Sequence, residues 1–264
     1  MARQGATKQK LYLYAVAPTS NGWNFGPIGL DGGTVYSIAN GRVCAVVSNV
    51  PEKLRPERRQ LAAHQEVLKG LMGETAGILP VAFGVVGDGP DAIRRILSRN
   101  QKPFLEQLRH VAGRVEMGLR VTWDVPNIFE YFVQTHPELR AARDGFFGSH
   151  REPTQNDKIE LGRLFDRLLM EDREAHAERL VEVLTPHCVE IKQNKPRTER
   201  EAVNLACLVG RDGREQFEAA VFEAAKLFDN SYAFDYNGPW APHNFVDMTL
   251  DLLPARASDR NAAR

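Results

Sequence analysis

Residues 34–50, TVYSIANGRVCAVVSNV, form the strongest local signal in the chain. Two runs rich in β-branched residues flank the pair Asn40-Gly41, and such a pair tolerates the positive φ angles of a type I′ turn. The stretch therefore predicts a β-hairpin with Asn40-Gly41 at its tip.

A further strand is expected before the hairpin, over residues 11–17, LYLYAVA. Side chains alternate between the two faces of a strand, so Tyr12 and Tyr14 share one face. The other face takes Leu11, Leu13 and Ala15. Stacking of nucleic-acid bases on the two tyrosines is disfavoured, because no RNA-recognition signature accompanies them, so we expect packing across strands.

Strand and helix patterns alternate through the rest of the first half. Apolar residues recur at helical spacing over residues 57–75, Pro80 restricts the next strand to a sheet edge or a bulged position, and a helix begins at Pro90. Residues 113–124, GRVEMGLRVTWD, then alternate as a half-buried strand. We predict an α+β domain over residues 1–124, a ferredoxin-like sheet with helices on one face.

The second half, residues 125–264, is expected to be another α+β domain, with a helical insertion. Its helical part spans about 126–184, including a long amphipathic helix that Pro186 ends. Its sheet part spans about 186–250. The remainder, 254–264, is polar and is predicted to be disordered.

Charge and cysteine content exclude several classes of protein. The 34 basic and 34 acidic residues cancel, and no polybasic block is present, which disfavours binding to nucleic acid. Cys44, Cys188 and Cys207 lack the spacing of a disulfide framework or a zinc site. The apolar run after the polar start is too short for a signal peptide or a membrane span, so we expect a cytoplasmic protein.

No template for catalysis, metal binding or cofactor binding fits the sequence, so we expect no enzyme and no cofactor. The glycine-rich stretch Gly87–Arg95 precedes a helix, and an anion at that helix N-terminus is an open alternative to a simple loop and cap. A small-molecule sensor, regulator or enzyme using this stretch is therefore the competing hypothesis. His64 lies on an apolar helical stripe and is expected to be a core or boundary residue.

The string YNGPWAPHNFV, residues 236–246, is unusually apolar for a chain end. Trp240 and Phe245 each offer about 150–250 Å² of surface, and at about 25 cal/mol per Å² their burial is worth several kcal/mol. The stretch is expected either to lock the two domains together or to dock a partner. Its candidate residues are Gly238, for a tight turn, the stiffening Pro239 and Pro242, and the aromatic Trp240 and Phe245. Tyr12 and Tyr14 complete this set of candidate partner-binding or domain-locking residues.

Seven segments in this order resemble the gas vesicle F/L family (GvpF/GvpL) over nearly the whole chain. They are LYLYAVA, the hairpin TVYSIANGRVCAVVSNV, HQEVLKGLM, ILPVAFGVV, GRVEMGLRVTWD, VNLACLVGRDGREQFEAAV and YNGPWAPHNFV. The family's tail reads close to G-P-W-P-P-Y-x-F, so Ala241 stands in place of a proline and His243 in place of an aromatic residue. Ala82 stands where a basic residue is common.

The resemblance implies a non-catalytic accessory protein of gas vesicle formation, with two α+β domains, the first a modified ferredoxin fold. Such a protein is expected to be cytoplasmic and gas vesicle associated, and to bind the small apolar shell protein during assembly. Other minor gas vesicle proteins are expected as further partners. It implies no cofactor. An F-like and an L-like role both stay open, as does retention in the mature vesicle.

Overall fold

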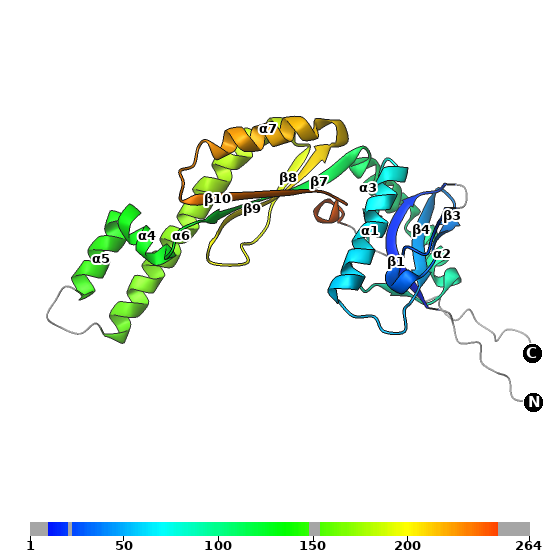
Figure 1. The fold of residues 1–264 in the computed structure, drawn as a ribbon, viewed down its shortest axis with the longest axis horizontal. Helices are drawn as coiled ribbons and strands as arrows, with labels where there is room; N and C mark the ends of the chain where they lie inside the picture. Colours follow the sequence, from blue (N-terminus) through cyan, green and yellow to red (C-terminus); the bar gives the residue numbers. More distant parts are fainter. Residues whose placement is uncertain (1–9, 21–22, 148–153, 248–264) are drawn as a thin grey trace, which may run out of the picture. The chain divides into compact units, whose positions relative to one another are not determined.

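The computed structural model describes residues 10–20, 23–147 and 154–247. They form two compact units, one of residues 10–114 with residues 240–247 and one of residues 115–239. Each unit combines helices with an antiparallel sheet, which confirms the α+β class (Figure 1). The expected disordered tail, residues 254–264, lies outside the described residues.

The first unit contains a sheet with the strand order β2-β3-β4-β1-β5, in which β6 also pairs with β1. The central strands β1 and β4 are buried on both faces, because their residues are almost all apolar and carry the burial expected of interior strands. The strands are β1 (Leu11–Pro18), β2 (Asn24–Gly26), β3 (Val35–Asn40), β4 (Val43–Asn49), β5 (Leu79–Pro80) and β6 (Val86–Gly87).

The predicted hairpin is formed by β3 and β4, but its turn lies one residue later than expected. Asn40 pairs with Val43, so the loop residues are Gly41 and Arg42. Gly41 takes the positive φ of 64°, while Asn40 stays in the strand and donates its side-chain amide to the Arg94 carbonyl at 2.7 Å. A positive φ only at the first loop position is typical of a type II′ turn rather than the type I′ turn predicted.

Helices cover both faces of this sheet, not the single face predicted (Figure 1). Helix α1 (Arg58–Glu74) packs on the face that carries Tyr12 and Tyr14. Helices α2 (Pro90–Arg99) and α3 (Gln101–Val111) pack on the opposite face. A strand without a polar face needs cover on both sides, and this explains the difference.

The expectation that Ala15 lies on the same face of β1 as Leu11 is wrong. The register of β1 against β4 shifts between Leu13 and Ala15, so Tyr14 is the extra residue of a β-bulge. The bulge turns Ala15 to the tyrosine face, where it joins the core under α1 instead of following Leu11.

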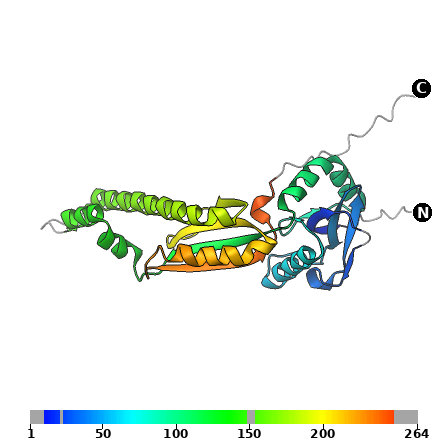
Figure 2. The same ribbon diagram turned by 90° about the horizontal axis from the view of Figure 1, so that it is seen from above.

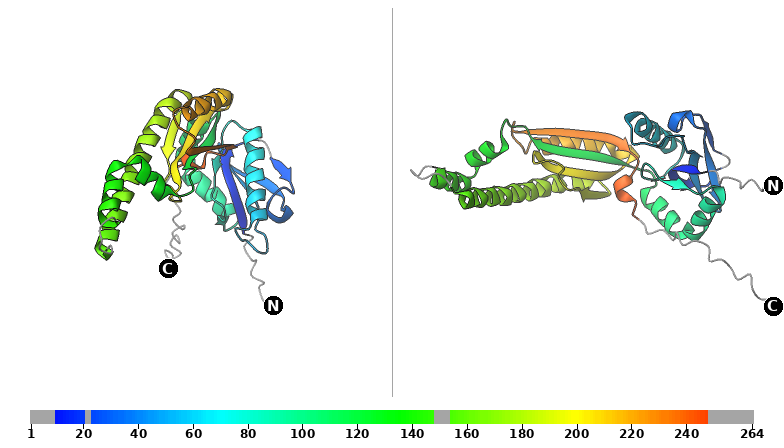
Figure 3. Two further views of the ribbon diagram at one scale, coloured as in Figure 1. Left: turned by 60° about the vertical axis from the view of Figure 1, so that its left-hand side comes forward. Right: turned by 90° about the horizontal axis from the view of Figure 1, so that it is seen from below.

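The second unit is built on a four-stranded sheet with the order β10-β7-β9-β8. The strands are β7 (Arg114–Trp123), β8 (Glu190–Gln193), β9 (Glu201–Gly210) and β10 (Tyr232–Trp240). β7 and β10 run side by side in it (Figure 3). The sequence analysis predicted that β7 belongs to the first sheet and that the domain boundary follows residue 124. The second unit begins instead at Val115, at the start of this strand. Alternation in β7 shows that one face is buried, but it carries no information about which sheet supplies the neighbours.

Helices α6 (Gln155–Leu184) and α7 (Arg214–Ala225) contact each other and β9. A capping box of Thr154 and Asp157 begins α6. Helices α4 (Ile128–Thr135) and α5 (Pro137–Phe147) pack on α6, whose first half extends beyond the sheet (Figure 2). These helices form the predicted helical insertion.

Candidate functional site

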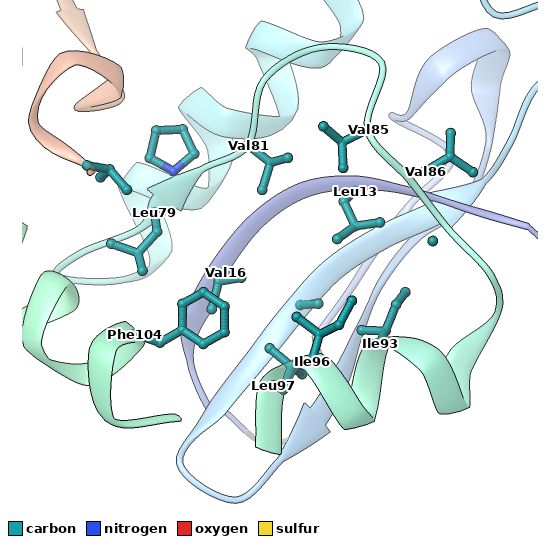
Figure 4. Close-up of a pocket in the computed structure, with 14 residues that line it drawn as sticks. Leu13, Val16, Leu79, Val81, Val85, Val86, Ile93, Ile96, Leu97 and Phe104 are labelled. Carbon is teal, nitrogen blue, oxygen red and sulfur yellow. The ribbon is translucent and has the colours of Figure 1, made fainter. Parts of the chain in front are cut away.

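An apolar cavity of about 390 Å³ lies in the first unit, between β1 and the helices α2 and α3 (Figure 4). Its deep walls are the buried side chains of Leu79, Ile93, Leu97 and Phe104. Among the described residues, every lining side chain is hydrocarbon, except at Gly87, which has none. The volume lies within the range of about 300–1,000 Å³ that is typical of ligand pockets. Its chemistry suits an aliphatic group and offers no side chain to bind a charge.

The cavity exists because the chain leaves the sheet edge between β5 and β6. Val81 N–H donates to the Tyr14 carbonyl at 2.8 Å, and Leu13 N–H donates to the Val85 carbonyl at 3.0 Å. Between these anchors, residues 82–84 pass over the edge of β1 without pairing in the ladder. Pro80 thus lies at an edge, as the sequence predicts, and this interruption leaves room for the cavity beneath Val81 and Val85.

Two valines form an exposed rim of the cavity. Val85 is 41% exposed and Val86 is 37% exposed, although both line the cavity. At the neighbouring Gly87, an added Cβ would lie 3.0 Å from Ile93 Cγ1 and 3.3 Å from Leu13 Cδ1. The absence of a side chain at this position therefore keeps α2 close to β1.

On the other face of the sheet, Tyr12 holds the same edge segment. Its hydroxyl accepts a hydrogen bond from Gly84 N–H at 3.2 Å and lies 2.8 Å from Nδ1 of His64. The Phe83 ring packs edge-to-face on both Tyr12 and His64. Burial, with a smaller contribution from the nearby His243, lowers the pKa of His64 to about 4. The ring is therefore neutral at pH 7, which agrees with the core position expected for His64.

Tyr12 and Tyr14 are core residues rather than members of a partner-binding surface. Both are 0% exposed. The Tyr14 hydroxyl accepts from Leu30 N–H at 2.9 Å and lies 3.0 Å from Ser48 Oγ. The hydroxyl groups are thus satisfied inside the unit, which explains how two tyrosines can be buried together. The spacing of the two residues could not reveal that α1 covers their face.

The C-terminal candidates separate into buried and exposed residues. Phe245 is 2% exposed and Pro242 is buried, both within the first unit, whereas Trp240 is 44% exposed. Val246 lines the apolar cavity. The end of the described chain is therefore anchored by Phe245, while Trp240 presents much of its indole ring to solvent.

Gly238 and Pro239 belong to β10 in the second unit. Gly238 has a φ of 126°, and an added Cβ would lie 2.9 Å from the Glu116 carbonyl oxygen and 2.9 Å from Met117 Sδ. The peptide bond between Gly238 and Pro239 is cis. Only glycine fits here, so this residue serves the packing of β10 on β7.

The glycine-rich stretch Gly87–Arg95 shows a loop and a helix start. Gly89, with a φ of 86°, directly precedes α2, whose first turn carries Asp91. Arg94 Nη1 donates to Asp91 Oδ1 at 3.0 Å, with both side chains exposed. An acidic side chain at the helix N-terminus repels an anion, and the adjoining cavity is apolar. The geometry supports the loop and cap better than the anion-binding alternative.

A buried carboxylate in the second unit was missed by the sequence analysis. Glu201 is 2% exposed, lies 3.0 Å from Arg120 Nε and accepts from Asn204 Nδ2 at 2.9 Å. Arg197 N–H donates to its other oxygen. These donors satisfy the charge inside the sheet, which indicates a structural role. Only the alternation of Arg120 on β7 hinted at a polar face here.

The described ranges contain no group of three or more His, Cys, Asp or Glu side chains placed to hold a metal ion. Cys44, Cys188 and Cys207 are free thiols. None of the helices in the described ranges has both the length and the apolar character that crossing a membrane requires.

Comparison with known sequences gives one family over almost the full described chain. The family described as "Gas vesicle synthesis protein GvpL/GvpF" matches residues 10–247. Gas vesicle protein F of Streptomyces sp. strain CB03234 is 28% identical over 242 residues, which cover 89% of this chain and 99% of that protein. Gas vesicle protein F of Dolichospermum flosaquae is 28% identical over 243 residues, with 90% and 98% covered.

A solved structure shows the same fold. The crystal structure of the gas vesicle protein GvpF from Anabaena sp. PCC7120 matches with a TM-score of 0.78 and 25% identity. The match covers 91% of this chain and 99% of that one. Both units of the present fold therefore have counterparts in a single chain.

Proposed function

The chain belongs to the GvpL/GvpF family of gas vesicle synthesis proteins, and from this premise we propose that it is a non-catalytic, cytoplasmic assembly factor that binds the small apolar shell protein. Other minor gas vesicle proteins are further proposed partners. The observation that carries the proposal is the apolar cavity with its exposed valine rim, in a chain of this family.

The chemistry of the cavity supports binding rather than catalysis. The part of its lining that the structure describes offers no nucleophile, acid or base, because each of those side chains is hydrocarbon. A shell subunit in transit exposes apolar surface that invites premature association, and a chaperone-like partner prevents this by covering part of it. Aliphatic side chains inserted between Val85 and α2 would be removed from water, at about 25 cal/mol per Å² of buried area.

Trp240 is a further exposed apolar residue of the first unit. Exposed tryptophans are enriched among residues that dominate binding energy, because a large rigid ring is ordered at little entropic cost. At 44% exposure the Trp240 ring keeps considerable area to offer. We assign it to the docking surface, in preference to the domain lock that the sequence left open.

The test is association with the shell protein in a reconstituted pair. The wild-type chain is compared with the double variant Val85→Asp/Val86→Asp, which places charge on the rim. The matched control is Ile159→Asp, because Ile159 is also 42% exposed but lies on α6 in the second unit.

The expected result is that the wild type and the control retain the shell protein and that the rim variant loses it, at unchanged melting temperature. Absence of any association with the wild type would overturn the function itself. Retention by a folded rim variant would overturn only the assignment of the surface.

A further inference from the structure

Two of the three free cysteines meet at one edge of the second sheet. Cys207 is 0% exposed in the interior strand β9, and Cys188 is partly buried just before the edge strand β8. The two side chains are hydrogen bonded to each other through their sulfur atoms. The third thiol, Cys44, lies on β4 in the first unit.

A β-bulge at the start of β8 brings Cys188 to the face of Cys207. Glu190 pairs with Leu208, so its side chain lies on the face opposite to that of Cys207. Strict alternation would give Cys188 the same face as Glu190. Val189 N–H, however, also donates to the Leu208 carbonyl, at 2.7 Å. Two residues of one strand thus lie opposite a single residue of the other, and this extra residue reverses the alternation.

The backbone holds the two cysteines in this arrangement. Cys188 N–H donates to the Thr185 carbonyl at 3.3 Å, and Cys207 pairs with Ile191 in the ladder between β8 and β9. A disulfide forms without backbone movement only where the two side chains already point towards each other. Side chains that hydrogen bond through sulfur meet this condition.

The two thiols differ in reactivity. The hydrogen bond to Cys188 is the main cause that raises the pKa of Cys207, and burial and the charge of Glu116 on β7 add to it. A hydrogen bond that raises a pKa stabilises the protonated form, so Cys207 S–H donates and Cys188 Sγ accepts. Cys188 is also the more exposed of the two. An oxidant therefore reaches the sulfur of Cys188 first.

We propose that Cys188 and Cys207 are a redox-sensitive thiol pair, which hydrogen peroxide converts to a disulfide. The thiolate of Cys188 attacks one peroxide oxygen, the O–O bond breaks, and Cys188 becomes a sulfenic acid while the other oxygen leaves as hydroxide, which takes up a proton to form water. The sulfur of Cys207 then attacks the sulfenic sulfur, and its proton leaves with the sulfenic hydroxyl group as a second water molecule. Two electrons pass from the two thiols to the peroxide.

The disulfide would bind the edge of the sheet covalently to its interior. It closes a ring of residues 188–207 that contains β8 and the connection to β9. β8 has only four residues and pairs with β9 at the end of the described strand order, so it is a strand that opens easily. Such a disulfide is transient where thiol reductants are present, because thiol–disulfide exchange reverses it. The proposal is independent of any binding to the shell protein.

The experiment exposes the reduced, folded full-length chain to hydrogen peroxide, with no other protein present. Mass spectrometry reads the loss of two hydrogen atoms from the intact chain and, after digestion, the peptides that are linked. The variants are Cys188→Ser and Cys207→Ala, and the matched control is Cys44→Ser, which removes the thiol of the first unit. Melting curves are recorded before and after oxidation.

We expect the wild type and the Cys44→Ser control to lose two hydrogen atoms, to give one linked peptide pair containing Cys188 and Cys207, and to recover with dithiothreitol. Their melting temperatures should rise by roughly 3–10 °C on oxidation, because the ring restricts the unfolded chain. Cys188→Ser should form no disulfide within the chain. Cys207→Ala should leave Cys188 as a sulfenic acid that dimedone traps.

Three results would overturn the proposal. The first is a folded wild-type chain that keeps its thiols in peroxide, or in which Cys188 is oxidised to a sulfinic acid without a disulfide. The second is a disulfide that contains Cys44 or that links two chains. The third is a melting temperature that falls on oxidation, because this would show that the bridge does not fit the native sheet.

Discussion

The Tyr12 hydroxyl lies 2.8 Å from Nδ1 of His64, and this buried pair is coupled to the edge of the apolar cavity. The same hydroxyl accepts from Gly84 N–H, within the segment that bridges β5 and β6. Because the amide proton occupies an acceptor site of the oxygen, the tyrosine proton is available to Nδ1 of the neutral imidazole. A polar cluster on one face of the sheet thus holds the segment that bounds a cavity on the other face.

Tyr12→Phe is expected to destabilise the first unit by about 1–3 kcal/mol, because it leaves the Gly84 amide and Nδ1 of His64 without the hydroxyl. The measurement is denaturant unfolding. Tyr36→Phe is the control, since Tyr36 is only half-buried on β3, and it is expected to cost less than the Tyr12 change. Equal effects of the two substitutions would show that the hydroxyl of Tyr12 has no special role.

His64 predicts a specific acid sensitivity. Its pKa is about 4 in the folded chain and about 6.5 when unfolded, so the unfolded state binds more protons between these values. The contribution of His64 to stability is therefore fully present above about pH 6.5 and decreases as the pH drops towards 4. The total loss from this group is up to about 3 kcal/mol. Below pH 4 the contribution of His64 is constant.

His64→Gln tests this, because the amide oxygen can accept from Tyr12 but does not titrate. The free energy of unfolding is measured from pH 4 to 7 for both proteins. The variant should show a smaller slope over this window, with residual slope from groups such as His243 and His176, whose pKa values are also lowered by burial. Parallel curves for the two proteins would contradict a neutral, buried His64.

The sequence predicted well what depends on local chemistry. The β3–β4 hairpin follows from two β-branched runs around a glycine, and α6 follows from its apolar stripe and its ending at Pro186. The class of the fold and the family were also predicted, because seven separate segments supply independent signals. These features need no knowledge of which elements meet in space.

Features that depend on tertiary partners could not be predicted. Periodicity shows that one face of β7 is buried, but its assignment to the second sheet depends on pairing with β9 and β10, which lie far away in the sequence. Tyr12 and Tyr14 gave no sign that α1 covers them. The cavity arises from a few residues that leave the ladder between β5 and β6, and no composition signal marks such an interruption.

Substitution of Phe245 is expected to affect stability, whereas substitution of Trp240 is expected to affect binding. Phe245→Ala should cost about 3–5 kcal/mol, since the ring is buried in the first unit and its loss leaves a cavity. Trp240→Ala should cost much less stability and should weaken binding of the shell protein. Melting curves and a binding assay on both variants check this. A large fall in melting temperature for Trp240→Ala would favour the domain lock over the docking role.

Gly238 and Gly210, which both lie in strands of the second sheet, allow two glycine-to-alanine substitutions to be compared. Gly238→Ala is expected to destabilise the second unit by more than about 2 kcal/mol, because the new Cβ meets the Glu116 carbonyl and Met117 Sδ and the φ of 126° disfavours any side chain. Gly210 has a φ of −59° and no atom within 4 Å of an added Cβ. Gly210→Ala should therefore be neutral or slightly stabilising, through the reduced entropy of the unfolded chain. Thermal unfolding of the two variants checks this prediction. If both variants have the same melting temperature, then β10 can move away from β7 without cost, and the terminal stretch is not held by this contact.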